Sequence, residues 1–313
     1  MTHTARSAVD SRSVPELGYT RNGLPLSYNR APASDLADWI ARLGVIQIDL
    51  PPGETLSCGL FSETPSLRVQ LAGDCEVETL AGLQQHQARN VLFCGPQSRL
   101  RSLRVTSSIV SLIVALRPSA CNALIELNGP DLVDRVISPP DDCCEHILSL
   151  INPAGTPEDW LVRLEGFFRD HLATLPNAEP DPVTAHFEKI AFRDPAMSIS
   201  QAAREIGVDR RRLERLVSRD FGMPPKQVLK RARALDMASF LRGVADKEEG
   251  QAFALRYYDE SHLIREFTEL FGMPPGRFKA LAQPLLTSSL DARQARRLET
   301  LERLAPGAKR PWE

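Results

Sequence analysis

The stretch DRRRLERLVSRDFGMPP, residues 209–225, ends in a pentapeptide that the chain contains twice: FGMPP stands at Phe221–Pro225 and again at Phe271–Pro275. The fifty-residue offset extends beyond the pentapeptide, because six further pairs of residues correspond at the same spacing. They are Gln201 and Gln251, Ala202 and Ala252, Asp209 and Asp259, Leu213 and Leu263, Arg215 and Arg265, and Val217 and Phe267. Repetition at a fixed offset indicates a duplicated supersecondary unit. Each copy is typical of a short helix, a tight turn and a second helix, which is a helix-turn-helix.

The residues that begin and end helices recur in both copies. Polar side chains that can cap a helix precede each apolar stretch, and a glycine follows it. The expected caps and stops are Ser198 with Gln201, Gly207, Asp209 and Gly222 in the first copy, and Asp246 with Glu249, Asp259 and Gly272 in the second. Pro224 and Pro225 stand at the start of a further long helix, where proline is tolerated. The sequence therefore predicts two helix-turn-helix units with second helices at about 209–221 and 259–271.

The second helix of the first unit has an apolar and a polar face. Its apolar stripe is Leu213, Leu216, Val217 and Phe221. The opposite stripe is Arg211, Glu214, Arg215 and Ser218, beginning near the end of the helix that enters a major groove. An arginine can pair with guanine and a carboxylate can accept from cytosine, so Arg211, Glu214 and Arg215 are candidate base readers. Basic residues expected nearer the phosphates are Arg210, Arg212, Arg219, Lys226, Lys230, Arg231 and Arg233. A merely solvated face is the alternative, against which the duplication argues.

The second unit differs in charge. Residues 246–271 hold three basic and seven acidic residues, so this unit is expected to hold phosphates less well. Its outward stripe is Ser261, Ile264, Arg265 and Thr268, with His262 beside it. Ile264 could contact a thymine methyl group or another protein, and His262 could equally be a cap or packing residue. The second unit could therefore read a few bases or mainly support the first.

The segment SISQAAREIGVDRRRLERLVSRDFGMPPKQVLKRARALDMASFL, followed by YYDESHLIREFTELFGMPPGRFK, resembles the double helix-turn-helix domain of AraC/XylS-family bacterial transcriptional regulators. The resemblance covers about residues 183–282. It implies base-reading positions at Arg211, Glu214, Arg215, Ser261, His262 and Arg265. It also implies a rigid helix from Pro225 to Leu241 between the units. Two features depart from the family pattern. Its usual Gly-Phe before the second recognition helix is Arg256–Tyr257 here, and its usual apolar residue at the start of the preceding helix is Gln251.

The first half of the chain has a hydrophobic pattern typical of strands rather than helices. Residues 14–120 contain short alternating or β-branched runs between Pro, Gly, Asn and Ser, typical of an all-β sandwich or barrel. Helical spacing follows over 121–175, and PNAEPDP at 176–182 is a linker by composition. This half resembles, more weakly, the cupin-like domains that sense a small molecule or mediate dimerisation in such regulators. The expected class is α+β in two domains: a disordered lead at 1–13, a cupin-like β-barrel domain with C-terminal helices at 14–175, an all-α double helix-turn-helix at 183–285, and a tail at 286–313 that could add a helix.

Charge and composition narrow the function. Residues 182–313 carry 24 basic and 18 acidic side chains, a net charge of +6, whereas residues 1–181 have a net charge of −8. This asymmetry favours a nucleic-acid-facing C-terminal part. No run of about 18 apolar residues and no export signal is found, so we expect a cytoplasmic protein with reduced thiols and no membrane partner. Cys143, Cys144 and His146 lack the spacing of a zinc site, and His86 is the single histidine of 14–120, so we predict no metal, no cofactor and no enzymatic activity.

The predicted function is a sequence-specific DNA-binding transcriptional regulator. Its expected partner is double-stranded DNA, with a small-molecule effector, a homodimer partner and, for an activator, RNA polymerase as further possibilities. Two alternatives stay open. One is a protein-interaction module with a single DNA-reading unit; the other is an enzyme in the β domain with a DNA tether.

Overall fold

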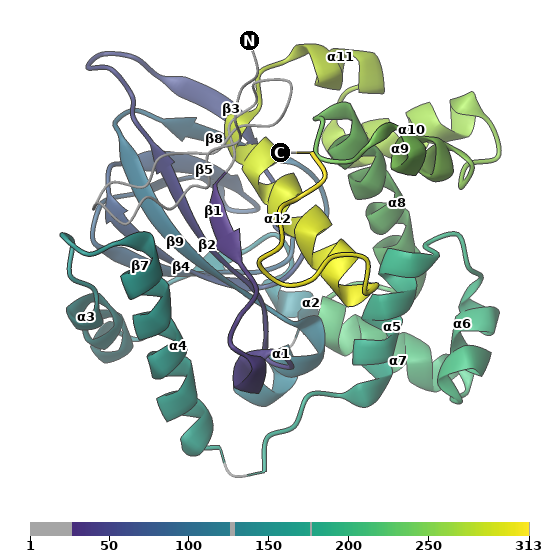
Figure 1. Ribbon diagram of the computed structural model, residues 1–313, viewed down its shortest axis with the longest axis horizontal. Helices are drawn as coiled ribbons and strands as arrows, with labels where there is room; N and C mark the ends of the chain where they lie inside the picture. Colours follow the sequence, from purple (N-terminus) through teal and green to yellow (C-terminus); the bar gives the residue numbers. More distant parts are fainter. Residues whose placement is uncertain (1–26, 126–128, 176, 313) are drawn as a thin grey trace.

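The computed structural model describes residues 27–125, 129–175 and 177–312, so the expected disordered lead at 1–13 lies outside the described residues. A sheet-rich N-terminal part lies beside a helical C-terminal part, as Figure 1 shows. This is the α+β two-domain organisation that the sequence predicts. None of the helices in the described ranges is long and apolar enough to cross a bilayer.

The strands of the N-terminal domain form two antiparallel sheets, ordered β1-β2-β9-β4-β7-β10 and β3-β8-β5-β6. The strands are β1 (Tyr28–Arg30), β2 (Ile40–Ile48), β3 (Leu56–Leu60), β4 (Ser66–Ala72), β5 (Cys75–Thr79), β6 (Gly82–His86), β7 (Asn90–Cys94), β8 (Arg101–Val105), β9 (Ile109–Leu116) and β10 (Val136–Ile137), with a 3-10 turn at Ser34–Leu36. The nested pairs β2·β9, β3·β8, β4·β7 and β5·β6 give the jelly-roll arrangement of cupins. No pairing among the described strands joins the two sheets into a closed barrel, so the sandwich alternative describes the domain better.

The two faces of the six-stranded sheet differ in polarity, because side chains alternate along each strand. One face packs its apolar side chains against helices α3 (Asp141–Leu150) and α4 (Pro157–Ala173). These side chains include Leu43, Val45, Leu67, Val69, Leu112 and Val114. The opposite face, which points toward the second sheet and the helical domain, carries Arg42, Ser66, Arg68 and Gln70. The same face also carries Ile46, Leu92 and Ile109, which pack with side chains of the second sheet, so the inner face of the sandwich is mixed in character.

Short helices α1 (Pro118–Leu124) and α2 (Gly129–Leu132) lead from the sheets toward the helical domain. The helices of that domain are α5 (Pro182–Arg193), α6 (Ile199–Ile206), α7 (Arg210–Phe221), α8 (Pro225–Leu241), α9 (Lys247–Ala254), α10 (Glu260–Phe271), α11 (Pro275–Ala280) and α12 (Pro284–Thr300). Helices α6 and α7 form the first unit and α9 and α10 the second, with α8 between them (Figure 1). Each unit has its own apolar core.

The predicted caps and stops are confirmed. Ser198 and Gln201 form a reciprocal capping box, and Asp209, Asp246 and Asp259 each accept a backbone N–H at the start of their helices. Gly207, Gly222 and Gly272 adopt left-handed backbone conformations, with φ of 80°, 73° and 68°. A side chain is strained in that conformation, which explains glycine at each of these helix ends.

Helix α12 lies between the sheet domain and the rest of the helical domain (Figure 1). It packs against β2 and β3 on one side and against α5 and α8 on the other. The tail at 286–313 is predicted from the sequence as a segment that could add a helix, and most of α12 lies in that tail. Its charged side chains, however, are buried rather than solvated, among them Asp291, Arg293, Arg296 and Arg297. The tail therefore forms part of the interface between the domains.

Candidate nucleic-acid interface

Helix α7 presents a free arginine face at its N-terminal half. Leu213, Val217 and Phe221 are buried in the core of the first unit, which fixes the orientation of the helix. On the other side Arg211, Arg212 and Arg215 are exposed. Their guanidinium groups have no hydrogen bond or ion pair with any described residue. Because these donors are unpaired and lie near the helix N-terminus, they are available to bases and phosphates.

Glu214, the candidate acceptor for cytosine, is half-buried on the same helix. Its carboxylate accepts from Nε of Arg210, one turn earlier, at 2.8 Å. Both side chains are exposed enough for this i,i+4 pair to be a weak one, so it can open when DNA approaches. Arg210 and Glu214 therefore form an exchangeable pair beside the free arginines.

The residues predicted to contact phosphates differ in whether their side chains are open to solvent or already engaged within the protein. Arg210, Arg212 and Lys226 are exposed beside α7, where phosphate contact is geometrically open. Lys230 forms an ion pair with Glu269, and Arg219 pairs with Asp181 at 2.8 Å and Asp220 at 2.6 Å. These two side chains are engaged within the protein, although they are half-exposed.

Arg231, which the sequence predicts to contact a phosphate, is buried instead. Its side chain is 3% exposed and donates through Nη1 to the carbonyl oxygen of Gln97 in the N-terminal domain, at 3.1 Å. Burial lowers its pKa to about 10, although Glu63 acts in the opposite direction. The prediction of a phosphate contact at Arg231 is wrong for this arrangement, because the residue lies in the interface between the domains. Arg233 is likewise engaged with Glu266, at 2.7 Å.

The second recognition helix, α10, exposes fewer donors. Ser261 and Arg265 are exposed, and Ile264 is 40% exposed. His262 is instead engaged at the start of the helix: Nδ1 accepts from the backbone N–H of Tyr258 at 3.3 Å, and Nε2 lies 3.2 Å from the Glu266 carboxylate. The geometry of His262 supports the cap and packing alternative over base reading.

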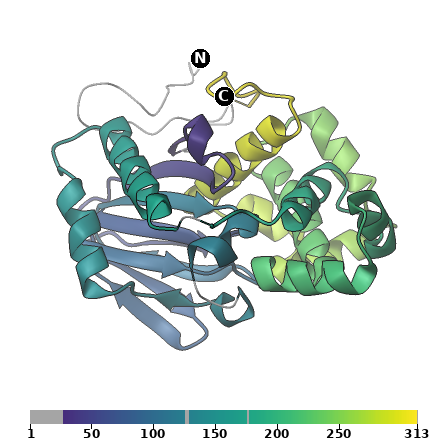
Figure 2. The same ribbon diagram turned by 90° about the horizontal axis from the view of Figure 1, so that it is seen from below.

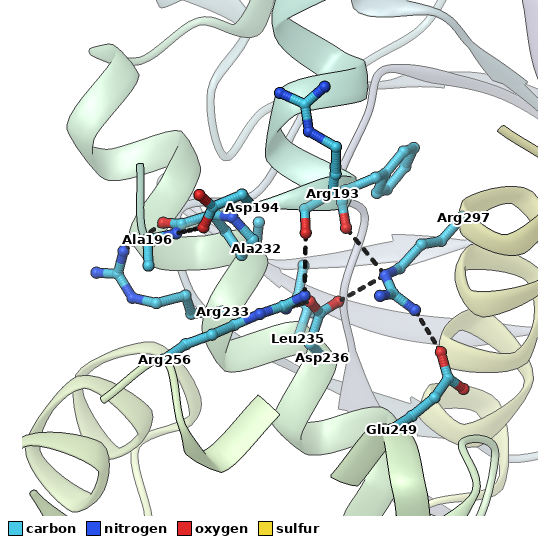
Figure 3. A network of polar contacts seen from close by, with 12 residues as sticks. Arg193, Asp194, Ala196, Ala232, Arg233, Leu235, Asp236, Glu249, Arg256 and Arg297 are labelled. Carbon is cyan, nitrogen blue, oxygen red and sulfur yellow. Dashed lines mark hydrogen bonds and ion pairs between the residues drawn. The ribbon is translucent and has the colours of Figure 1, made fainter. Parts of the chain in front are cut away.

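The turn before α10 carries one of the two departures from the family pattern, Arg256–Tyr257, whereas the other, Gln251, is exposed on α9. Arg256 forms an ion pair with Asp236 on α8 and donates to the carbonyl oxygen of Arg193 (Figure 3). Arg293 of α12 pairs with the other oxygen of the Asp236 carboxylate at 2.6 Å. Tyr257 is buried, and its ring packs edge-on against His262. Asp236 is not among the residues predicted from the sequence; its one signal is that it is the single charged residue in the mostly apolar stretch ALDMASFL.

Figure 3 also shows that Arg297 of α12 joins the same network. Its Nη1 donates to Glu249 on α9 at 2.6 Å, and its Nε donates to the carbonyl oxygen of Phe192. The guanidinium lies over the ring of Phe253, 4.9 Å from its centroid. Helix α12 thus holds α5, α8 and the second unit together through buried charges.

The N-terminal domain contacts the C-terminal ends of both recognition helices. The backbone N–H of Leu100 donates to the carbonyl oxygen of Leu270, and the ring centroids of Phe61 and Phe271 are 6.4 Å apart. Gly129 lies so close to α7 that a Cβ there would be 1.9 Å from the carbonyl oxygen of Arg219. Because these contacts are at the helix C-termini, the N-terminal ends that enter a groove remain exposed.

The geometry defines a two-domain protein whose helical part contains two helix-turn-helix units. Residues 202–280 match the protein family described as a helix-turn-helix domain. The C-terminal domain is an AraC-type helix-turn-helix domain, which confirms the AraC/XylS resemblance. No curated protein matches the chain.

Solved structures are similar over most of the chain. An apo ToxT variant from Vibrio cholerae is 13% identical, with 77% of this chain and 98% of that chain covered and a TM-score of 0.46. Wild-type ToxT from Vibrio cholerae with unsaturated fatty acid bound is 14% identical, with 76% and 94% covered and a TM-score of 0.43. The AraC-like transcriptional activator CuxR is 15% identical, with 67% and 86% covered and a TM-score of 0.27.

Proposed function

We propose that this chain is a cytoplasmic transcriptional regulator that binds specific double-stranded DNA, with α7 as the main reading helix and α10 as a weaker one. The observation that carries the proposal is the set of three exposed, unpaired arginines on α7, Arg211, Arg212 and Arg215. The planar guanidinium group suits phosphate and nucleic-acid recognition, and the N-terminal part of such a helix is the part that contacts base edges, so this unpaired row favours DNA as the partner. Arg211 and Arg215 would read bases and Arg212 would contact a phosphate.

We further propose that the N-terminal domain regulates this activity, by binding a ligand or by dimerising. The support is its contact with both units, through Gln97 to Arg231 on α8 and through Leu100 to Leu270 on α10. A change in this domain can therefore alter how the two units are oriented toward successive grooves. Specific binding depends on that orientation.

A salt titration of DNA affinity tests the proposal. A regulator that makes about six phosphate contacts should lose affinity with a slope near −5 when the logarithm of the association constant is plotted against log salt concentration, measured on DNA from its own promoter region. Binding that does not depend on salt, or the same affinity for unrelated DNA of equal length, would contradict specific recognition.

A second candidate function has one observation in its favour. Leu255 and Tyr258, in the turn between α9 and α10, are 86% and 93% exposed. Together with the acidic surface of residues 246–271 they favour a protein contact at the second unit, which would leave α7 as the single DNA reader. An Arg265→Ala variant that keeps full affinity and unchanged sequence preference would favour this candidate.

A further inference from the structure

The chain reverses direction after α12, and the segment 301–312 runs back along that helix (Figure 1). The reversal takes place at Glu302, whose backbone has a φ of 57°. The N–H of Arg303 donates to the carbonyl oxygen of Leu298, which is the pairing found where a helix ends in a left-handed residue. Glycine usually occupies that position, and a glutamate there is strained. Contacts further along the segment therefore have to hold the reversed chain in place.

The segment is exposed in its middle and buried at two residues beyond it. Residues 305–309 are exposed, and so is Pro311. The side chain of Arg310 is 11% exposed, however, and Trp312 is 3% exposed. A tryptophan buried to this extent contributes a large apolar area, and its indole N–H requires a hydrogen-bond partner. Arg310 and Trp312 are therefore the two anchors of the segment.

Both anchors bind the carboxylate of Asp291 on α12, which is fully buried. Nη1 of Arg310 donates to Oδ2 at 2.5 Å, and Nε1 of Trp312 donates to Oδ1 at 2.7 Å. The third donor is Nδ2 of Asn29 on β1, at 2.7 Å. Arg310 is the one described residue that forms an ion pair with Asp291. A buried carboxylate that loses its counter-charge is strongly destabilising, so Asp291 depends on the returning segment.

The same contacts fasten α12 to the sheet domain. Nη2 of Arg310 donates to the backbone oxygen of Asn29 at 2.8 Å and to its Oδ1 at 3.0 Å. Nε of Arg42 on β2 donates to the same Oδ1 at 2.8 Å, and its Nη1 donates to Glu299 at 2.6 Å. Helix α12 is thus held on β1 and β2 at two of its residues, Asp291 and Glu299. The returning segment completes the attachment at Asp291.

On its other side α12 holds the second helix-turn-helix unit. Gln294 and Arg297 both donate to the carboxylate of Glu249, in the first turn of α9, at 2.7 and 2.6 Å. Arg293 donates to Asp236, the aspartate that also pairs with the turn before α10. Within the described part of the chain, no side chain of α12 is hydrogen-bonded to α6 or α7. Whatever fixes α12 on the sheet domain therefore fixes the second unit more than the first.

We propose that residues 301–312 form a latch that closes over α12 and positions the second unit for DNA. Arg310 and Trp312 are positioning residues, which act on that unit through Asp291 and α12. When the latch opens, Asn29 is the one described donor left to Asp291, and α12 loosens together with its pairs to Glu249 and Asp236. The role of the latch in DNA reading rests on the proposed function; its closure over α12 does not.

Closure is tested by amide hydrogen exchange of the full-length chain without DNA. Arg310→Gln removes the charge of one anchor, and Lys309→Gln removes the same charge from its exposed neighbour, as the matched control. In Arg310→Gln, amides of α12 and β1 should exchange at least about tenfold faster than in the wild type, whereas Lys309→Gln should leave them unchanged. Exchange of α4, on the opposite face of the six-stranded sheet, should not change. A chain that ends at Lys309 lacks both anchors and should show a larger increase in the same elements.

Selection of DNA sites from a random pool separates positioning from general stability. Arg310→Gln should lose most of the enrichment of the base pairs read by α10 and keep those read by α7. The latch is overturned if α12 exchanges alike in Arg310→Gln and Lys309→Gln, or if α4 exchange rises as much as α12 exchange. Equal losses at both sets of base pairs would overturn its positioning role. If the wild-type chain enriches no sequence, the proposed function fails, and the exchange experiment still decides whether the latch exists.

Discussion

Asp236 on α8 and Arg256 in the turn before α10 form an ion pair in which the aspartate is fully buried. Arg256 occupies a position where the AraC/XylS pattern has glycine, and its side chain spans from the second unit to the linker helix. Arg293 binds the same carboxylate from α12. The position of the second unit is therefore set by a charge network that includes the tail, in addition to apolar packing.

Replacing Asp236 with asparagine should destabilise the protein strongly. Asp236→Asn keeps the shape but leaves Arg256 and Arg293 without their counter-charge in a buried place. Removing one partner of a buried pair costs about 3–5 kcal/mol. Urea unfolding followed by circular dichroism measures the change. The matched control is Glu248→Gln, an exposed acidic residue on α9; equal stability of the two variants would show that the network adds nothing.

Truncating Arg215 should reduce both DNA affinity and selectivity. Arg215→Ala removes an unpaired donor from the exposed face of α7, so we expect a loss of about 1–3 kcal/mol and relaxed preference at one base pair. Competition binding with single-base variants of the DNA site that the chain prefers measures both the loss of affinity and the loss of selectivity. Arg163→Ala, on the exposed face of α4, is the control and should bind as the wild type does. A uniform loss on every sequence would assign Arg215 to the phosphates.

The second unit should contribute less than the first. Arg265→Ala removes its exposed arginine, which lies on an acidic surface. We expect a loss below the range of about 1–3 kcal/mol that a good base contact provides. The same competition assay compares the two variants directly. A loss at Arg265 as large as that at Arg215 would mean that the two units are equal readers.

Burial of Arg231 predicts that Arg212 and Arg231 contribute differently to the salt dependence of DNA binding. Arg212→Met should reduce the magnitude of the salt slope by about 1, because it removes a phosphate contact. Arg231→Met should leave the slope unchanged, since that side chain is held by Gln97. If Arg231→Met lowers the slope as Arg212→Met does, then Arg231 leaves the domain interface when DNA binds.

His86 should make the protein less stable at mildly acidic pH. Burial, and then the charge of Arg68, lower the pKa of His86 below its ordinary value. As the pH falls through about 6.5, His86 binds a proton in the unfolded chain but not in the folded chain. The free energy of unfolding is therefore unaffected by His86 above about pH 6.5 and decreases as the pH falls below it. Urea unfolding at pH 7.5 and 5.5 should show a larger loss for the wild type than for His86→Gln. Equal losses would place the pH dependence elsewhere.

The helical domain was predictable from sequence because its signals are local. Asp209, Gly222 and their fifty-residue counterparts begin and end helices by backbone chemistry alone, and the Arg211 face follows from helical spacing. The role of Arg231 was not predictable, because it depends on Gln97, which lies 134 residues away in the sequence. The same holds for Arg68 and α12, whose surroundings come from four strands and a tail helix brought together by the fold. Periodicity predicts which face of an element is polar, and the tertiary structure decides what that face meets.

The most direct test of the account is to sequence the DNA fragments that the full-length chain retains from a random pool. Two unequal reading units predict an enriched site with one strongly constrained block and a second, weaker block about one helical turn, roughly 10 base pairs, away. The stronger block should lose its constraint in Arg215→Ala. Retention without any enriched sequence, or a constrained block that Arg215→Ala leaves unchanged, would contradict the claim that α7 reads DNA.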